Sequence, residues 1–268
     1  MNIKHWKVLV LGVLFTAFIL TGCSNTDTST KQEEASANQS QSQSVDNNQA
    51  VDDFSNQGTD FNFESKTVLL NSGYEMPIIG LGTWTLDDET AENEDVFITT
   101  KIVPYGFDDY DAAIDECIEA LGLDYIDLLL IHQQGTDEKE LYAAIERAVE
   151  NGKVHSLGIS NYYTQEDFER IIENAKIMPA VIQNENHIFF QNTEFQSYVK
   201  QFGVIIESYY PFGGRGHTSD SMNNEVITEI AEAHGKTGAQ IILRWHLQAG
   251  YRLKQSRPYY RKLRHFRF

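Results

Sequence analysis

This 268-residue sequence has few cysteines and little positive charge. Its two cysteines, Cys23 and Cys117, are too few for a disulfide framework. The formal net charge at pH 7 is -18, from 39 acidic and 21 basic residues. A nucleic-acid-binding protein needs a basic surface, so we expect no nucleic acid among the partners.

Several site-forming motifs are missing as well. The sequence contains no glycine-rich dinucleotide fingerprint, no nucleophile elbow and no His-x-x-x-His metal helix. We therefore predict no metal site. The missing glycine-rich turn also argues against a doubly wound nucleotide-binding sheet.

The amino terminus has an apolar run, Val8–Leu20, that is too short to span a membrane comfortably. Its thirteen residues follow a short basic segment and have the length of a signal-peptide core. The run ends in Leu20-Thr21-Gly22-Cys23, which resembles the lipobox of bacterial lipoproteins. The resemblance implies that residues 1–23 are a lipoprotein signal peptide and that Cys23 carries the lipid. The alternative is an ordinary secretory signal with an incidental cysteine.

The next segment is polar and poor in large apolar residues, most clearly over Ser24–Asp60. Such a composition cannot bury enough surface to offset the entropy cost of ordering the chain. We predict that residues 24–66 form a disordered tether. Together with a lipid on Cys23, this tether would hold the protein at the extracytoplasmic face of the cell membrane.

Strand-like and helix-like segments alternate from residue 96 to residue 248, after a predicted hairpin of Thr67–Leu70 and Glu75–Ile78. Steady alternation predicts parallel strands joined by crossover helices, and therefore an α/β fold. We expect a barrel. The predicted strands are Ile79–Thr83, Val96–Lys101, Ile126–His132, His155–Ser160, Ala180–Gln183 and Val204–Tyr209.

Two of these strands end on ionisable side chains. Ile126–His132 is a nearly continuous apolar run, which is typical of a strand buried on both faces, and it ends at His132. Val96–Lys101 ends at Lys101. In barrels of alternating strands and helices the chemistry lies at the carboxyl ends of the strands, so both are candidate site residues. A histidine satisfied by backbone at a strand end is the alternative for His132.

Five short segments carry a resemblance to a known family. They occur in the order Gly80-Leu-Gly-Thr-Trp84, Ile98-Thr-Thr-Lys101, Asp124-Tyr-Ile-Asp-Leu-Leu-Leu-Ile-His132, Gly158-Ile-Ser-Asn161 and Ser208-Tyr-Tyr-Pro211. Together they resemble the aldo-keto reductases, NADPH-dependent oxidoreductases on an eight-stranded TIM barrel. The resemblance covers roughly Val68 to Tyr251.

The resemblance implies a chemistry and a set of roles. The family moves a hydride from the nicotinamide to a small carbonyl substrate, while a tyrosine supplies the proton. A lysine paired with an aspartate lowers the pKa of that tyrosine, and a histidine binds the substrate oxygen. By similarity Lys101 is the lysine and His132 the histidine. The implied cofactor-binding residues are Ser160, Asn161, Gln183, Tyr209, Phe212 and Gly213, and Thr83 and Trp84 line the substrate pocket.

The sequence also departs from the family pattern. Only twelve residues, Trp84–Asp95, separate the first strand from Val96, too few for a helix, a strand and a second helix. The motif Asp-Thr-Ala…Tyr, which carries the family's catalytic aspartate and tyrosine, is not found. Tyr105 follows Lys101, but its spacing gives no reason to place it at the reacting atoms. We therefore expect both catalytic groups to be absent.

A change of charge marks the carboxyl terminus. All 39 acidic residues precede Arg252, and the last seventeen residues carry seven basic side chains. We predict that residues 252–268 are an unrelated basic tail, either translated from a different frame or able to bind anionic lipids. Residues 67–251 would then form an incomplete TIM (β/α)8 barrel of about six of eight strands, with the second and eighth missing.

Three interpretations of function follow. The first is an NADPH-dependent reductase of aldehydes or ketones, the family activity. The second is a catalytically inactive, membrane-anchored nucleotide-binding or scaffold lipoprotein. The third is the product of a disrupted gene. Binding of NADPH and turnover of a carbonyl compound separate the three.

Overall fold

The computed structural model describes residues 61–82, 97–214 and 216–256, all within the compact unit Asn48–Phe268. The strands are β1 (Phe61–Asn62), β2 (Thr67–Leu69), β3 (Glu75–Pro77), β4 (Ile79–Gly82), β5 (Thr99–Ile102), β6 (Ile126–Ile131), β7 (Val154–Ser160), β8 (Val181–Glu185), β9 (Ile205–Tyr209) and β10 (Tyr251–Ser256). The helices are α1 (Tyr110–Leu121), α2 (Glu138–Glu150), α3 (Gln165–Ile172), α4 (Thr193–Lys200), α5 (Thr218–Met222), α6 (Glu225–His234) and α7 (Gly238–Gln248). No helix in these ranges is long and apolar enough to cross a membrane.

A small antiparallel sheet, β1-β2-β3, precedes the main fold. The predicted hairpin is confirmed: β2 pairs with β3 in the register Val68↔Met76. Strand β1 pairs with β2 through Phe61↔Val68. The prediction that residues 61–66 belong to a disordered tether is therefore wrong, because Phe61 supplies apolar surface to this sheet. Residues 24–60 lie outside the described ranges.

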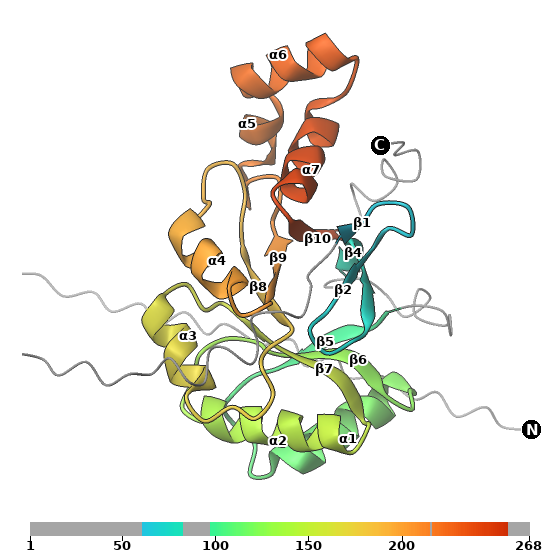
Figure 1. The fold of residues 1–268 in the computed structure, drawn as a ribbon, viewed down its shortest axis with the longest axis vertical. Coiled ribbons are helices and arrows are strands. Elements are labelled where there is room, and N and C mark those ends of the chain that lie inside the picture. The colour runs from blue at the N-terminus through green and yellow to red at the C-terminus, as the bar shows by residue number, and fades with distance from the viewer. Residues whose placement is uncertain (1–60, 83–96, 215, 257–268) are drawn as a thin grey trace, which may run out of the picture. The chain divides into compact units, whose positions relative to one another are not determined.

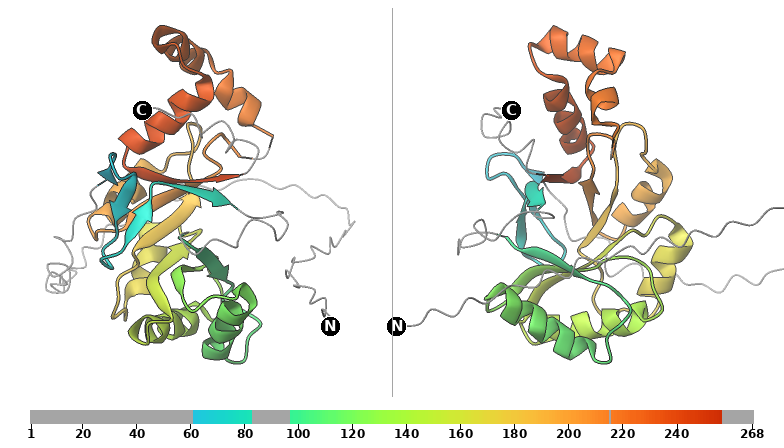
Figure 2. Two further views of the ribbon diagram at one scale, coloured as in Figure 1. Left: turned by 90° about the vertical axis from the view of Figure 1, so that its right-hand side faces the viewer. Right: turned by 180° about the vertical axis from the view of Figure 1, so that it is seen from behind.

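The main sheet has seven parallel strands in the order β4-β10-β9-β8-β7-β6-β5. Figure 1 shows it curled, with α1 to α4 along its outer side, α7 next to β10, and α5 and α6 packed against α7. Figure 2 shows the curvature from two further sides. Strands β4 and β5 are its two edges and do not pair with each other. The predicted α/β class and incomplete barrel are confirmed. In the described ranges no strand lies between β4 and β5, where a second barrel strand would lie.

Buried apolar side chains cover both faces of the sheet. In β6, Leu129 and Ile131 belong to the core under the outer helices, whereas Leu128 and Leu130 belong to a second core with Val181. This alternation follows from the two-residue period of a strand, and it explains why the segment reads as continuously apolar. The hairpin β2–β3 contributes to the second core, so it covers one end of the curled sheet.

Polar side chains cap several of the helices at their first turns. At the start of α7, Thr237 and Gln240 form a capping box. The Thr164 side chain likewise accepts the backbone N–H of Asp167 at the start of α3. Strand β5 is displaced from its predicted range, since it runs from Thr99 to Ile102 instead of ending at Lys101.

The eighth strand is present, contrary to the prediction. Strand β10 pairs in parallel with β9 through Arg252↔Glu207 and with β4 through Lys254↔Gly80. The prediction failed because strand pairing uses the backbone, and the basic side chains at positions 252 and 254 alternate with the buried Tyr251 and Leu253. The change of charge at residue 252 therefore does not mark the end of the fold, and residues 257–268 lie outside the described ranges.

A buried ion pair makes the basic strand compatible with the core. The Arg252 guanidinium contacts the Glu207 carboxylate, and the two side chains are only 4% and 1% exposed. Arg252 Nε also donates to the Pro77 carbonyl oxygen at 2.7 Å. A buried charge needs such partners, because removal from water costs several kcal/mol per ion.

We expect Arg252→Met to lower the free energy of unfolding by about 3–5 kcal/mol, because it leaves the Glu207 carboxylate buried without its partner. The double variant Arg252→Met/Glu207→Met should recover most of this loss, since apolar replacement of a whole buried pair is often neutral. Urea unfolding of the full chain, followed by circular dichroism, measures both.

Arg147→Met is the matched control, because Arg147 pairs with Asp111 at the surface, where the side chains are 47% and 53% exposed. Its loss should cost no more than about 1 kcal/mol. Equal losses in the two single variants would show that the buried pair does not hold β10 in the sheet.

Candidate functional site

Neighbouring parallel strands bring the predicted site residues to one edge of the sheet. The registers Lys101↔Leu130, Ser160↔Gln183 and Glu185↔Tyr209 align the carboxyl ends of β5 to β9. His132 directly follows β6 and donates its backbone N–H to the Ile102 carbonyl oxygen at 2.8 Å. The structure therefore brings Lys101, His132, Ser160, Asn161, Gln183 and Tyr209 together at this carboxyl edge.

Lys101 lies at this edge without an aspartate partner among the described residues. Its Nζ donates to the Oγ of the buried Ser160 at 3.0 Å. Burial and the positive charge of Lys254 lower the pKa of Lys101 to about 7, although the negative charge of Glu207 opposes the shift. Lys101 is therefore close to half protonated at neutral pH.

His132 is held by its backbone and keeps an exposed side chain. Its carbonyl oxygen accepts from Asn161 Nδ2 at 2.7 Å. Desolvation and the nearby charges of Lys101 and Lys254 lower the pKa of His132 to about 4. The imidazole is therefore neutral at pH 7, with one N–H available to donate.

Asn161 links three strand ends. Its backbone N–H donates to the Gln183 carbonyl oxygen at 3.1 Å and to Asn184 Oδ1 at 2.9 Å. Its side-chain Oδ1 accepts from the Tyr209 hydroxyl at 2.7 Å. The backbone φ of Asn161 is 65°, in the left-handed region that asparagine tolerates better than most residues. The side-chain amide is thus held at a fixed position on the rim.

Tyr209 is partly buried and bonded to a second tyrosine that the sequence does not single out. The hydroxyls of Tyr163 and Tyr209 lie 3.0 Å apart. Burial, followed by this hydrogen bond, raises the pKa of Tyr209 above its ordinary value. Its ring is a flat surface at the rim, and its phenol is a poor proton donor near neutral pH.

A polar row crosses the inner side of the sheet below the rim. The in-register residues Gln183, Glu207 and Arg252 lie side by side on β8, β9 and β10. Gln183 Nε2 donates to Glu207 Oε2 at 2.9 Å. The sequence signal for Glu207 is its position two residues before Tyr209 in a buried strand, which places both on one face.

Of the remaining predicted residues, two offer no side chain for direct contact with a ligand, and three lie outside the described ranges. The Phe212 side chain is buried in the second core, so only its backbone can face a ligand. Gly213 has φ 98°, and the hydroxyl of Ser221 fills the space that a side chain would need. Thr83, Trp84 and Cys23 lie outside the described residues.

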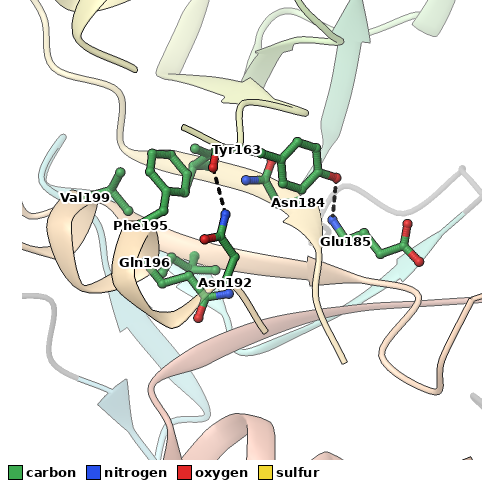
Figure 3. A pocket seen from close by; sticks show the side chains of 9 residues that line it. Tyr163, Asn184, Glu185, Asn192, Phe195, Gln196 and Val199 are labelled. Carbon is green, nitrogen blue, oxygen red and sulfur yellow. Dashed lines mark hydrogen bonds between the residues drawn. The ribbon is translucent and has the colours of Figure 1, made fainter. Parts of the chain in front are cut away.

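A small cavity lies behind the rim, between β8, β9 and α4 (Figure 3). Its volume of about 10 Å³ is near the minimum for one water molecule. Figure 3 shows the Tyr163 hydroxyl accepting from the Glu185 N–H, and Asn192 donating to the Tyr163 carbonyl oxygen. This cavity is too small for a substrate.

No tyrosine hydroxyl bonds to Lys101 within the described residues. Tyr209 and Tyr163 bond to each other and to Asn161. Tyr105 is 41% exposed and makes no hydrogen bond to Lys101. The described site therefore supplies a neutral imidazole and a lysine with a lowered pKa, but no lysine-bonded phenol.

We expect an NMR titration of the full chain to give a midpoint near pH 4 for His132. The unfolded value is near 6.5, so between pH 6.5 and 4 the unfolded chain binds a proton that the folded chain does not. His132 therefore lowers stability as pH falls through this window. Lys101→Met should raise the midpoint, because it removes a positive charge that opposes protonation.

Lys139→Met is the control for this titration, since Lys139 is an exposed lysine paired with Glu173. It should leave the His132 midpoint unchanged. A midpoint near 6.5 in the wild type, or no response to Lys101→Met, would contradict the charge arrangement described above.

Comparisons with known proteins identify the family. The aldo/keto reductase family model matches residues 79–258. A glyoxal reductase of Bacillus subtilis is 32% identical over 224 residues, covering 69% of this chain and 79% of the relative. A morphine 6-dehydrogenase of Pseudomonas putida is 29% identical over 235 residues, with the same two coverages.

Solved structures share the fold. An aldo/keto reductase from Brucella melitensis superposes with a TM-score of 0.64 at 28% identity, covering 71% of this chain and 88% of that one. A variant of Gox0644 in complex with NADPH gives a TM-score of 0.64 at 29% identity, covering 71% and 82%. Because the family model covers more than half of the sequence, this chain belongs to the aldo/keto reductase family.

Proposed function

We propose that this protein binds NADPH at the carboxyl edge of β7, β8 and β9 and acts on small carbonyl compounds. The observation that carries the proposal is the convergence of the Ser160 hydroxyl and the Asn161 and Gln183 amides beside the Tyr209 ring. Two relatives support it, since one is a glyoxal reductase and the structure of another was solved in complex with NADPH.

The donor set fits a nicotinamide carboxamide, which offers two N–H donors and one oxygen acceptor. Asn161 and Gln183 each supply an amide oxygen and an amide nitrogen, and Ser160 supplies a hydroxyl. These groups now bond within the protein, for example Tyr209 to Asn161 and Lys101 to Ser160. A bound carboxamide would exchange with those bonds, and the Tyr209 ring offers a face for a flat heterocycle.

Bound NADPH would supply a hydride to the carbonyl carbon. The protein's own part is to position the substrate and to stabilise the negative charge that develops on its oxygen. Neutral His132 can donate its N–H to that oxygen, and protonated Lys101 adds positive charge nearby. The described site provides no phenol bonded to Lys101, and general acid catalysis is typically worth 10²–10⁴-fold.

We therefore expect NADPH to bind, with quenching of tryptophan fluorescence, and carbonyl-dependent NADPH oxidation to be about 10²–10⁴-fold slower than in a complete relative. Both are measured on the purified full chain with a small aldehyde. Tyr209→Phe should keep binding, because it keeps the ring. Tyr209→Ala should weaken binding about 10-fold, the loss of roughly 1.4 kcal/mol of stacking.

The outcomes separate the alternatives. Binding with no turnover supports a catalytically inactive nucleotide-binding lipoprotein. Absence of both binding and turnover supports the product of a disrupted gene, and contradicts the proposed site. Turnover at the rate of a complete relative that is lost in Tyr105→Phe would show that Tyr105 supplies the proton.

The place of action is a separate part of the proposal. We propose that a lipid on Cys23 anchors the protein at the extracytoplasmic face of the cell membrane, with the polar segment after it as the tether. The support is the sequence Leu20-Thr21-Gly22-Cys23 after a short apolar run. A supply of NADPH at that face is then required for turnover.

Cys23→Ser should move the protein from the membrane fraction to the soluble fraction of a bacterial host and abolish incorporation of radiolabelled fatty acid. Cys117→Ser is the matched control, because Cys117 lies in α1 and packs against the outer core. It should leave fractionation unchanged. Labelled fatty acid in the Cys23→Ser protein would contradict the anchor.

A further inference from the structure

We propose that Lys101 forms an imine with small aldehydes or ketones, a covalent reaction that needs no nicotinamide and goes beyond the family's hydride transfer. Three observations support the proposal. Positive charges outnumber negative charges around Lys101, the nearby Glu207 carboxylate is hydrogen-bonded to other residues, and Lys101 lies on an edge strand.

Cations outnumber anions on the inner side of β5, β9 and β10. Lys101, Arg252 and Lys254 face one carboxylate, Glu207, among the described residues. Both Glu207 oxygens already accept hydrogen bonds, Oε1 from Arg252 and Oε2 from Gln183. The one hydrogen-bond partner of Lys101 there is the neutral Ser160 hydroxyl, at 3.0 Å. No described carboxylate bonds directly to the Lys101 ammonium.

These surroundings favour the neutral amine form of Lys101 over the ammonium form. Partial burial and the second ammonium of Lys254 both disfavour its charge, and the pKa of Lys101 falls to about 7. At pH 7 about half of Lys101 is then a free amine, against less than about a thousandth for an ordinary lysine with a pKa near 10.4. A desolvated lysine beside another cation is a recognised form of activated amine nucleophile.

The amine can be reached. Lys101 lies on β5, which forms one edge of the seven-stranded sheet, and part of the residue remains exposed. His132 is its neighbour at the rim, since the His132 backbone N–H donates at 2.8 Å to the carbonyl oxygen of Ile102, the residue after Lys101. A small carbonyl compound that enters from the carboxyl ends of β5 and β6 meets both side chains.

The reaction balances without an oxidant or reductant. The Lys101 nitrogen lone pair bonds to the carbonyl carbon, the C=O π electrons move to oxygen, and the nitrogen loses a proton while the oxygen gains one. Loss of the hydroxyl as water then gives the C=N bond. Neutral His132 can accept the proton from nitrogen and return it to the departing hydroxyl, as a general base and then a general acid.

The test is reductive trapping on the full chain. Propanal and sodium cyanoborohydride convert an imine into a stable propyl-lysine, which peptide mass spectrometry assigns to a residue. We expect the initial labelling rate of Lys101 to be half-maximal near pH 7 and, at pH 7, at least a hundredfold above that of the exposed Lys139. Equal rates at the two lysines would overturn the proposal.

Two variants test the cause of the reactivity. Lys254→Met removes a repelling charge and should move the Lys101 labelling midpoint to higher pH. Glu207→Gln removes the attracting charge and should move it to lower pH. Lys236→Met, at an exposed lysine, is the matched control and should leave the midpoint unchanged. A midpoint that does not respond to Lys254→Met would also overturn the proposal.

NADPH is absent from the labelling experiment. A failure of labelling therefore leaves the NADPH-binding proposal untouched, and a failure of NADPH binding leaves the imine proposal untouched. Circular dichroism of each variant shows whether a lost signal reflects unfolding. If Glu207→Gln does not fold, the shift of the Lys101 labelling midpoint in Lys254→Met still tests the proposal.

Discussion

The ion pair between Arg252 and Glu207 is the interaction on which the rest of the structure depends. It allows a strand with arginine and lysine on its inner side to lie between β9 and β4. The same carboxylate accepts a hydrogen bond from Gln183, one of the amides of the proposed nicotinamide site. Because both Glu207 oxygens are engaged, Lys101 and Lys254 share a carboxylate that bonds to neither. The stability of β10 in the sheet and the proposed reactivity of Lys101 therefore both depend on how Glu207 is bonded.

The sequence predicts most of the fold because buried parallel strands can be recognised from their continuous apolar composition. Ile126–Ile131 is apolar at nearly every position since both of its faces are covered, and Lys101 and His132 lie within one residue of the ends of their strands. Strand β10 cannot be recognised in this way, because it contains Arg252 and Lys254 and is not continuously apolar. Whether Arg252 can be buried depends on Glu207, which lies 45 residues earlier in the chain. The local sequence around Arg252 gives no information about Glu207. The positive charge of residues 252–268 therefore led to the wrong prediction that the whole segment is an unrelated tail.

The site is likewise predictable in position but not in electrostatics. Strand ends place Ser160, Gln183 and Tyr209 together, and family motifs suggest their roles. The pKa of Lys101 is set chiefly by burial and then by the charges of Lys254 and Glu207, which no motif contains. A histidine expected to titrate normally is neutral at pH 7 because burial and then the charges of two lysines lower its pKa. Such shifts arise only from the three-dimensional sum of charges and burial.

Among the described residues Lys101 has neither a bonded aspartate nor a bonded phenol, and this changes what it can do. In the family arrangement a paired, protonated lysine makes a neighbouring phenol acidic. Here Lys101 has a neutral hydroxyl as its partner and cations as neighbours, so its proton is weakly held. A group that served as a fixed positive charge becomes a base and a nucleophile, while His132 stays neutral beside it. In the proposed site the electrostatics around Lys101 therefore favour attack by nitrogen over delivery of a proton.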